Sequence, residues 1–291
     1  MAGRFRHAGR LVRAYSEQAK RPVLPAPSHP DWTRWPDTGL HAAWIGHTTV
    51  LLKIDGFTII TDPVFSERCG VSVGPVTIGL KRLVAPALDR ASLPHIDLIL
   101  LSHAHMDHFD LPSLRGLESK RTAVVTARST SDLLRVRRYG SVTEVGWGER
   151  AQVGPLTIRG FRVNHWGARL RTDLHRGYNG YVIENGRRRI VFGGDTADTR
   201  DFRVARSFGP VDLAIMPIGA YDPWIHAHCT PEQALRMADD AGAEHVLPVH
   251  HQTFRLSREP YKEPIERFLG AAGRNEHRVI TKSIGDQASL N

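Results

Sequence analysis

The feature that most constrains this chain is a group of histidines placed directly after a short apolar run. Ser102-His103-Ala104-His105-Met106-Asp107-His108 follows Leu98–Leu101, and a continuous apolar run of this length predicts a buried strand. Three imidazoles and a carboxylate therefore gather where a strand ends. His103 and His105 are two residues apart, so an extended backbone points both side chains the same way. Because neutral imidazole is the commonest metal ligand, we predict a metal site and disfavour a loop of solvated histidines.

Three further candidate ligands also follow expected strands. His165 follows the run at 156–163, Asp195 follows 190–192, and His250 follows 245–249. Each residue alone would be an ordinary strand-end or loop residue. Together they complete a set of five histidines and two carboxylates, which is typical of a site for two metal ions. The candidate metal ligands are His103, His105, Asp107, His108, His165, Asp195 and His250.

Short strands dominate the rest of the chain, with helices between them. Asp55-Gly56 and Asn185-Gly186 are two-residue hairpin signals. Thr230-Pro231-Glu232-Gln233 predicts a capped helix over 231–241, ended by Gly242. The remaining helices are expected at 111–119, 129–138 and 263–271. The other strands are expected at 43–45, 50–54, 57–61, 124–126, 142–145, 178–184, 213–216 and 279–281. This order favours an α/β fold with one sandwich domain over residues 41–291, after a basic, proline-containing extension at 1–40.

Charge and composition say more about partners than about fold. The net charge is +9, and six basic side chains against one acidic side chain fall in the first 21 residues. This segment could form a short basic helix that makes peripheral contact with a membrane surface, or it could be a mobile arm, which is the more common outcome for a terminus. The chain has no apolar run near 20 residues and no secretory signal, so we expect a cytoplasmic protein whose Cys69 and Cys229 are reduced. Without an RNA-binding arm or aromatic platform, we expect no nucleic-acid partner.

The ligand order resembles that of the metallo-β-lactamase-fold hydrolases over residues 40–285. The resemblance implies a four-layer αββα sandwich of two mixed β-sheets with the site at one edge. It also implies that His103, His105 and His165 hold one metal, that Asp107, His108 and His250 hold the other, and that Asp195 bridges them. Aspartate at 195 resembles the hydrolase branches, and histidine at 105 implies two divalent ions, Zn²⁺ in the first place and Mn²⁺ as the alternative.

Other motifs resemble the N-acyl-phosphatidylethanolamine phospholipase D group and, less closely, the ascorbate-6-phosphate lactonases. They include Trp44-Ile45-Gly46-His47, Thr61-Asp62-Pro63-Val64-Phe65 and His228-Cys229-Thr230-Pro231. The Asn-His-Tyr of the phospholipase group is replaced here by Ala104-His105-Met106. By this resemblance His228 is a candidate catalytic residue beside Asp195, although it could equally be a neighbour of a helix cap.

The resemblance implies a metal-dependent hydrolase in which a hydroxide shared by two ions attacks a phosphodiester phosphorus or a lactone carbonyl. We expect a phosphodiesterase on a phospholipid-like or other phosphodiester substrate. The alternatives are a lactonase or sugar-phosphate hydrolase and, third, a nucleic-acid processing or binding protein. The partner expected first is therefore a small-molecule or lipid substrate.

Roles are also expected for residues around the ligands. Asp62 is expected to orient the histidine loop. His47 could contact the site or be structural, and Trp166 and Tyr221 could line the pocket or belong to the core.

Overall fold

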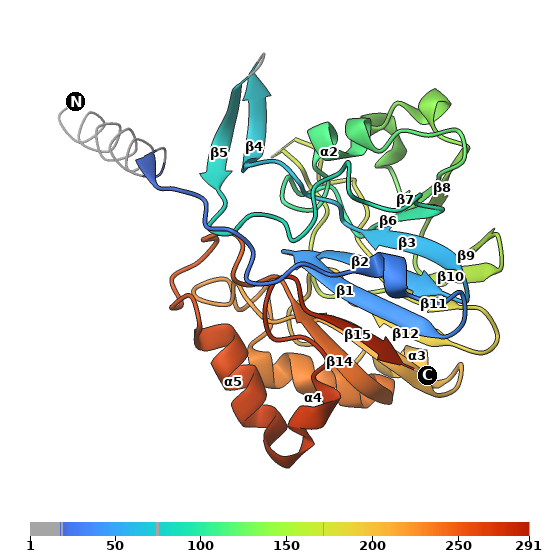
Figure 1. Ribbon diagram of the computed structural model, residues 1–291, viewed down its shortest axis with the longest axis vertical. Coiled ribbons are helices and arrows are strands. Elements are labelled where there is room, and N and C mark those ends of the chain that lie inside the picture. Colours follow the sequence, from blue (N-terminus) through green and yellow to red (C-terminus); the bar gives the residue numbers. More distant parts are fainter. Residues whose placement is uncertain (1–17, 19, 74–75, 171, 291) are drawn as a thin grey trace.

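Two β-sheets stacked face to face form the centre of the molecule (Figure 1). The computed structural model describes residues 18, 20–73, 76–170 and 172–290. One sheet has the order β15-β1-β2-β3-β6-β7-β8. Its strands are β15 (Gln287–Leu290), β1 (Leu40–Gly46), β2 (Thr49–Ile54), β3 (Phe57–Thr61), β6 (Leu98–Leu101), β7 (Ala123–Ala127) and β8 (Ser141–Val145). The neighbours β3, β6, β7 and β8 pair in parallel, whereas the pairs among β15, β1, β2 and β3 are antiparallel. The sheet is therefore mixed.

The second sheet is also mixed and has the order β14-β13-β12-β11-β10-β9. Its strands are β14 (Ala243–Val249), β13 (Val211–Pro217), β12 (Arg189–Phe192), β11 (Gly180–Glu184), β10 (Leu156–Phe161) and β9 (Arg150–Val153). Only the strands from β12 to β14 are parallel. A separate hairpin of β4 (Arg68–Val73) and β5 (Val76–Lys81) stands out from the sandwich in Figure 1.

The main hydrophobic core lies between the two sheets. Alternate residues of β1, including Trp44, face alternate residues of the second sheet, including Tyr181 and Phe192, and all three are fully buried. Because side chains alternate across a strand, the other face of each sheet is left to pack against an outer layer. Both Cys69 and Cys229 are buried and unpaired.

Helices cover both outer faces, which confirms the predicted αββα order. The second sheet packs against α3 (Arg203–Arg206), α4 (Pro231–Ala241) and α5 (Glu263–Ala272) through a large apolar cluster. The layer on the first sheet is thinner. It consists of α2 (Leu111–Gly116) and the short 3₁₀ turns η1 (Trp32–Arg34), η2 (Ser131–Leu133) and η3 (Val136–Arg138).

Local signals account for the elements that the sequence predicted well. Asp55-Gly56 has positive φ at both residues, as the tight turn between β2 and β3 requires. Asn185-Gly186 likewise joins the antiparallel pair β11 and β12. At the start of α4, the Thr230 hydroxyl accepts from the Gln233 N–H and the Gln233 side chain accepts from the Thr230 N–H. Gly242 ends α4 in the left-handed region, as predicted.

Three expectations about local structure were wrong. The predicted helix at 129–138 is replaced by η2 and η3, because the Glu144 carboxylate binds the N–H groups of residues 129–131 and holds them in a turn. The predicted strand at 279–281 is a single bridge between Val279 and Val246. The helix expected at 111–119 ends early, at Gly116. The β4–β5 hairpin, β9, α3 and β15 carried no signal that we used.

The leading segment at 22–38 is tied to the body of the molecule. Leu24 forms a bridge with Val84, and the Trp35 side chain is buried. The basic segment expected to contact a membrane lies outside the described residues, except for residues 18, 20 and 21. Among the described helices, none has the length and apolarity needed to cross a bilayer.

Candidate metal centre

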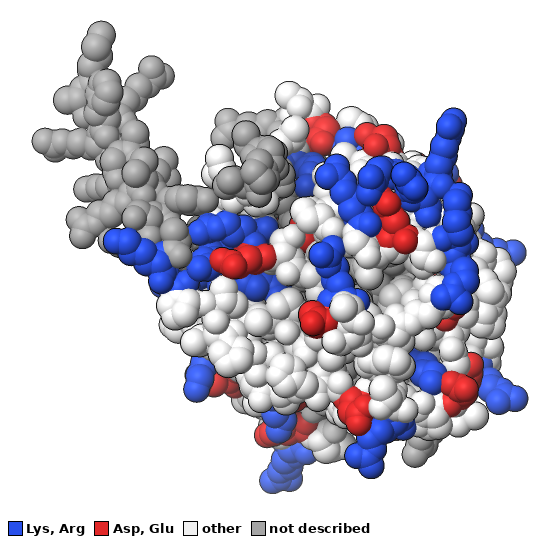
Figure 2. Space-filling model, turned by 45° about the horizontal axis from the view of Figure 1, so that its top comes forward, with Lys and Arg blue, Asp and Glu red and all other residues white. Residues whose placement is uncertain are grey.

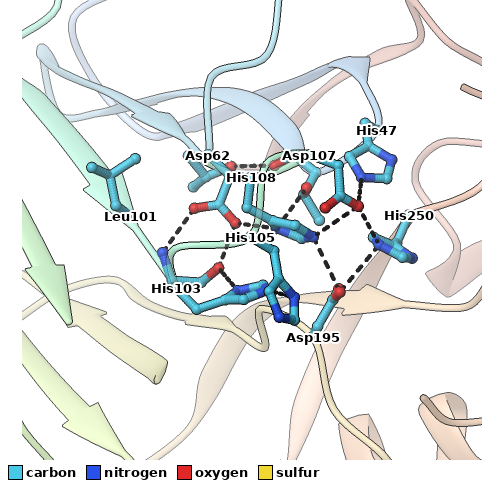
Figure 3. A network of polar contacts seen from close by, with 12 residues as sticks. His47, Asp62, Leu101, His103, His105, Asp107, His108, Asp195 and His250 are labelled. Carbon is cyan, nitrogen blue, oxygen red and sulfur yellow. Dashed lines mark hydrogen bonds and ion pairs between the residues drawn. The ribbon is translucent and has the colours of Figure 1, made fainter. Parts of the chain in front are cut away.

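The predicted ligands meet at one edge of the sandwich, where strands from both sheets end (Figure 3). The loop after β6 supplies four of them, and single residues follow β10, β12 and β14. Glycine at position 194 allows the chain before Asp195 to pass close to Ser102, at the end of β6. A Cβ atom on residue 194 would lie 2.9 Å from Ser102 Cβ. All seven predicted residues are brought together. With His47 added, they form two groups of four, and the ligand atoms within each group lie within 4.8 Å of one another: His103, His105, His165 and Asp195 in the first, and His47, Asp107, His108 and His250 in the second. Two smaller groups overlap these, namely Asp62, His103 and His108, and Asp195, His228 and His250.

Asp195 stands between these two groups. Its Oδ2 is 3.1 Å from His108 Nε2 and 3.2 Å from His250 Nε2, both in the second group. The same oxygen is 3.8 Å from His165 Nε2, in the first group. One carboxylate oxygen is therefore within reach of imidazoles from both groups.

Hydrogen bonds behind the histidines leave their Nε2 atoms facing the centre as acceptors. His165 Nδ1 donates to the Ala227 carbonyl at 2.9 Å. His103 Nδ1 lies 2.8 Å from Ser102 Oγ, whose own proton goes to Asp62 Oδ2 at 2.6 Å. His103 Nδ1 is therefore the donor in that pair. Such outer contacts fix the tautomer and ring orientation that a metal ligand needs.

Asp62 anchors the loop, as the sequence predicted. Its Oδ1 accepts from the Ser102 N–H at 2.8 Å, and its Oδ2 accepts from His108 Nδ1 at 2.7 Å. Both Asp62 and His108 are fully buried. The proton of His108 is thereby placed on Nδ1, and its Nε2 is left for the centre.

The donor set fits divalent metal ions. His108 Nε2, His250 Nε2 and Asp195 Oδ1 are buried, and none has a well-aligned hydrogen-bond partner in the described part of the chain. Buried polar atoms normally have a bonding partner. A metal ion, which accepts lone pairs from nitrogen and oxygen, would be a suitable partner for these three atoms. Burial opposes a charge on His250, yet Asp195 and Asp107 raise its pKa to about 9. The centre therefore favours positive charge, and imidazole nitrogens with carboxylate oxygens suit zinc and similar ions.

His47 belongs to the centre, a possibility that the sequence left open. Its Nε2 lies 3.0 Å from Asp107 Oδ2, and its carbonyl accepts from the His250 N–H at 3.0 Å. The ring is 1% exposed, and burial together with the charge of His250 lowers the pKa of His47 to about 3. A neutral His47 beside Asp107 is a fourth candidate contact for the second group.

His228 faces the centre and forms a third, smaller candidate metal group with Asp195 and His250. Its Nδ1 is 3.9 Å from Asp195 Oδ2, and its ring is stacked on His250 at 5.3 Å. Nδ1 is buried without a partner among the described residues, and burial lowers the pKa of His228 to about 4. His228 is therefore a neutral imidazole directed at the site. This position favours a role at the centre over that of a mere neighbour of the α4 cap.

The two aromatic candidates have different positions. Trp166 is 41% exposed and packs on His105 and His165, with ring centroids 4.8 and 4.5 Å apart, so it lines the mouth of the centre. Tyr221 is buried, and its hydroxyl donates to Glu263 at 2.8 Å. Tyr221 thus belongs to the packing around α5.

Sequence reasoning missed Arg169. Its Nη1 donates to the carbonyl oxygens of Ala104 at 3.1 Å and Phe109 at 2.8 Å, which lie at the two ends of the metal-ligand loop. These contacts join segments 60 or more residues apart, and no local pattern marks such an arginine.

Comparisons with known proteins identify the family and the fold of the chain. The family described as "Beta-lactamase superfamily domain" matches residues 58–251. An uncharacterized protein of Mycobacterium tuberculosis is 35% identical over 92% of this chain and 74% of its own length. The N-acyl-phosphatidylethanolamine-hydrolyzing phospholipase D 1 of Caenorhabditis elegans is 30% identical over 80% of this chain and 69% of its own. The metallo hydrolase Igni18 of Ignicoccus hospitalis shares the fold, with a TM-score of 0.65 and 19% identity over 87% of this chain and 99% of its own.

Proposed function

The chain belongs to the beta-lactamase superfamily and is a metal-dependent hydrolase related to the phospholipase D-like branch, and from that premise we propose that it hydrolyses phosphodiesters of phospholipid-like substrates. The observation that carries the proposal is the position of Asp195, whose Oδ2 is within 3.8 Å of imidazoles from both ligand groups. A carboxylate shared in this way suits two ions held side by side.

The proposed ligands follow the two groups. His103, His105 and His165 would hold one ion, Asp107, His108 and His250 the other, and Asp195 both. Zn²⁺ is the proposed metal, since its usual ligands are histidine and carboxylate. Bound ions would supply Lewis-acid activation of a water molecule and would neutralise charge on the phosphodiester.

The side chains of this protein have separate tasks in that reaction. Asp62 and Ser102 keep His103 and His108 in the tautomers that leave Nε2 free. Asp195 Oδ1, which is buried without a partner in the described residues, can accept the proton of the attacking water. His228 is neutral and has Nδ1 directed at the site, so it can hold a hydrogen bond to the phosphate or to the leaving oxygen.

A phospholipid-like substrate suits the loops around the centre. Trp166, Leu170 and Leu174 follow His165, while Trp224 and Ile225 precede His228, and all five are between 41% and 75% exposed. The two loops are tied together, because His165 Nδ1 donates to the Ala227 carbonyl. Exposed apolar side chains on functional loops favour an amphiphilic substrate. The name of the nematode relative also supports this class, and the basic first 21 residues would hold the protein at an anionic membrane surface.

The proposal is tested by comparing substrates on one metal-loaded preparation. Bis(p-nitrophenyl) phosphate, vesicles containing an N-acyl phospholipid, a simple lactone and a sugar phosphate are assayed in parallel. We expect turnover of both phosphodiesters, its loss in Asp195→Asn, and its retention in the exposed control Asp89→Asn. Turnover of the lactone or sugar phosphate alone would instead establish the alternative hydrolase.

A further inference from the structure

A second feature of the molecule is a cavity of about 410 Å³ that His250 and His251 help to line. It lies between the chain after β14, the leading segment and the end of β5. This volume is within the range of small-molecule sites, about 300–1,000 Å³. Most of its wall is apolar and includes Pro22, Leu24, Leu83, Phe254, Leu256 and Tyr261.

Backbone hydrogen bonds hold the walls of this cavity together. The Leu24 N–H donates to the Leu83 carbonyl at 2.9 Å, and the Leu83 N–H donates to the Thr253 carbonyl at 2.7 Å. Three segments that are distant in sequence are thus joined. The cavity is therefore preformed, which lowers the cost of ordering it around a ligand.

The charged groups at the cavity are mainly basic. Arg21 and Arg255 line it, and Figure 2 shows basic side chains gathered beside the β4–β5 hairpin. Among the described residues, Arg21 Nη2 donates to two neutral acceptors, the carbonyls of Lys81 at 2.7 Å and Arg82 at 3.2 Å, and its buried Nε has no partner there. Burial, with the charges of Arg255 and Arg68, lowers the pKa of Arg21.

In the described part of the chain, the acid that lines the cavity forms no ion pair with Arg21 or Arg255. Glu259 accepts from the Ala220 N–H at 2.6 Å, the Asp222 N–H at 3.2 Å and the Ser257 hydroxyl at 2.5 Å. Its oxygens are thus engaged with neighbouring backbone and hydroxyl donors. An apolar cavity flanked by two guanidinium groups matches a ligand with one alkyl chain and one anionic head.

We propose that this cavity binds a single-chain alkyl carboxylate, with the chain among the apolar residues and the carboxylate beside Arg21 and Arg255. The cavity borders the hydrolytic centre through His250, but its occupancy does not require the proposed phosphodiesterase activity. Because His250 and His251 form part of the wall, an occupant would lie next to one of the proposed metal ligands.

The probe for this proposal is dodecanoate, titrated calorimetrically below its micelle concentration into the full-length protein. We expect saturable 1:1 binding, weaker binding of octanoate, and much weaker binding of dodecanol, which has no charge. Leu24→Glu and Arg255→Glu should each weaken dodecanoate binding about tenfold or more, since they place a negative charge at the cavity. Both residues are exposed, so the fold should tolerate either change, and Arg187→Glu on the β11–β12 turn is the matched control.

Removal of metals with EDTA distinguishes binding of dodecanoate in the cavity from binding to the metal ions. Dodecanoate should still bind after EDTA if circular dichroism shows an intact fold, because no metal ligand is needed. The proposal is overturned if no saturable binding occurs, if Arg255→Glu and Arg187→Glu bind equally well, or if dodecanol equals dodecanoate. Loss of binding after EDTA with an unchanged fold would also overturn it, since the carboxylate would then sit on the metals.

Discussion

His108 Nδ1 donates to Asp62 Oδ2 at 2.7 Å, and neither side chain is exposed to solvent. This contact links the end of β3 to the ligand loop after β6, which are neighbours in the same sheet. Asp62 also accepts from the Ser102 N–H and hydroxyl. One buried carboxylate therefore orients two of the proposed ligand histidines.

Asp62→Asn should lower metal affinity. An amide oxygen is a weaker acceptor, and its NH₂ group would oppose the Ser102 and His108 donors. Loss of such an outer contact typically costs about 10- to 100-fold in metal affinity. Competition with a chromogenic chelator measures the metal affinity of the variant, with Asp89→Asn as the control. Unchanged affinity in Asp62→Asn would mean that the contact serves folding alone.

Arg169→Met should loosen the ligand loop at both ends. The change removes donors to the Ala104 and Phe109 carbonyls but keeps an unbranched side chain of similar length. We expect faster metal loss to chelator and lower turnover at limiting metal, both partly restored by excess metal. Arg187→Met, on an exposed turn, is the matched control. Turnover that stays low at saturating metal would place Arg169 in substrate binding instead.

His228→Ala should separate catalysis from metal binding. His228 also forms a candidate metal group with Asp195 and His250, so the variant distinguishes a catalytic contact from a metal ligand. If His228 is a catalytic contact, as proposed, we expect full metal content together with a loss of turnover of about 10²-fold or more. Metal analysis and turnover are measured on the same sample. A parallel fall in metal content would identify His228 as a ligand.

Glu144→Gln should destabilise the protein at neutral pH and much less in acid. Burial alone would raise the pKa of Glu144, but N–H donors from Ser129, Thr130 and Ser131 outweigh it and hold the pKa below its ordinary value. A carboxyl with a depressed pKa stabilises the fold above its unfolded pKa, about 4.3, and this stability is lost as pH falls through the folded pKa.

The expected difference in unfolding free energy from Glu144→Gln is about 1 kcal/mol at pH 7, because the group is only partly buried. Urea unfolding from pH 3 to 7 measures it, with the exposed Glu244→Gln as control. A difference that does not change with pH would show that the charge of Glu144 is unimportant.

Local signals were enough for much of the fold. The turn at Asp55-Gly56 and the capping box at Thr230 are encoded within a few residues, and the structure contains both. The helix expected at 129–138 failed because Glu144, from the next strand, captures the backbone donors of the turn. That competition depends on a tertiary contact, which helix propensity does not include.

The ligand positions were predictable because each follows a strand, and strand ends meet at one edge of a sandwich. His47 and Arg169 were not, since their partners Asp107 and Phe109 are each 60 residues away. The ring nitrogen that each candidate ligand histidine turns toward the centre was also beyond prediction. It depends on Ser102, Asp62 and the Ala227 carbonyl, which become neighbours only in the folded chain.

The metal content of wild-type protein and of Asp195→Asn tests the central claim most directly. After saturation with Zn²⁺ and removal of excess metal, we predict about two ions per chain in wild type, as a two-metal hydrolytic site requires. Asp195→Asn should retain about one ion or fewer, because the carboxylate between the two groups is gone. A wild-type content of one ion or fewer, or an Asp195→Asn content equal to that of wild type, would contradict a two-ion centre shared by Asp195.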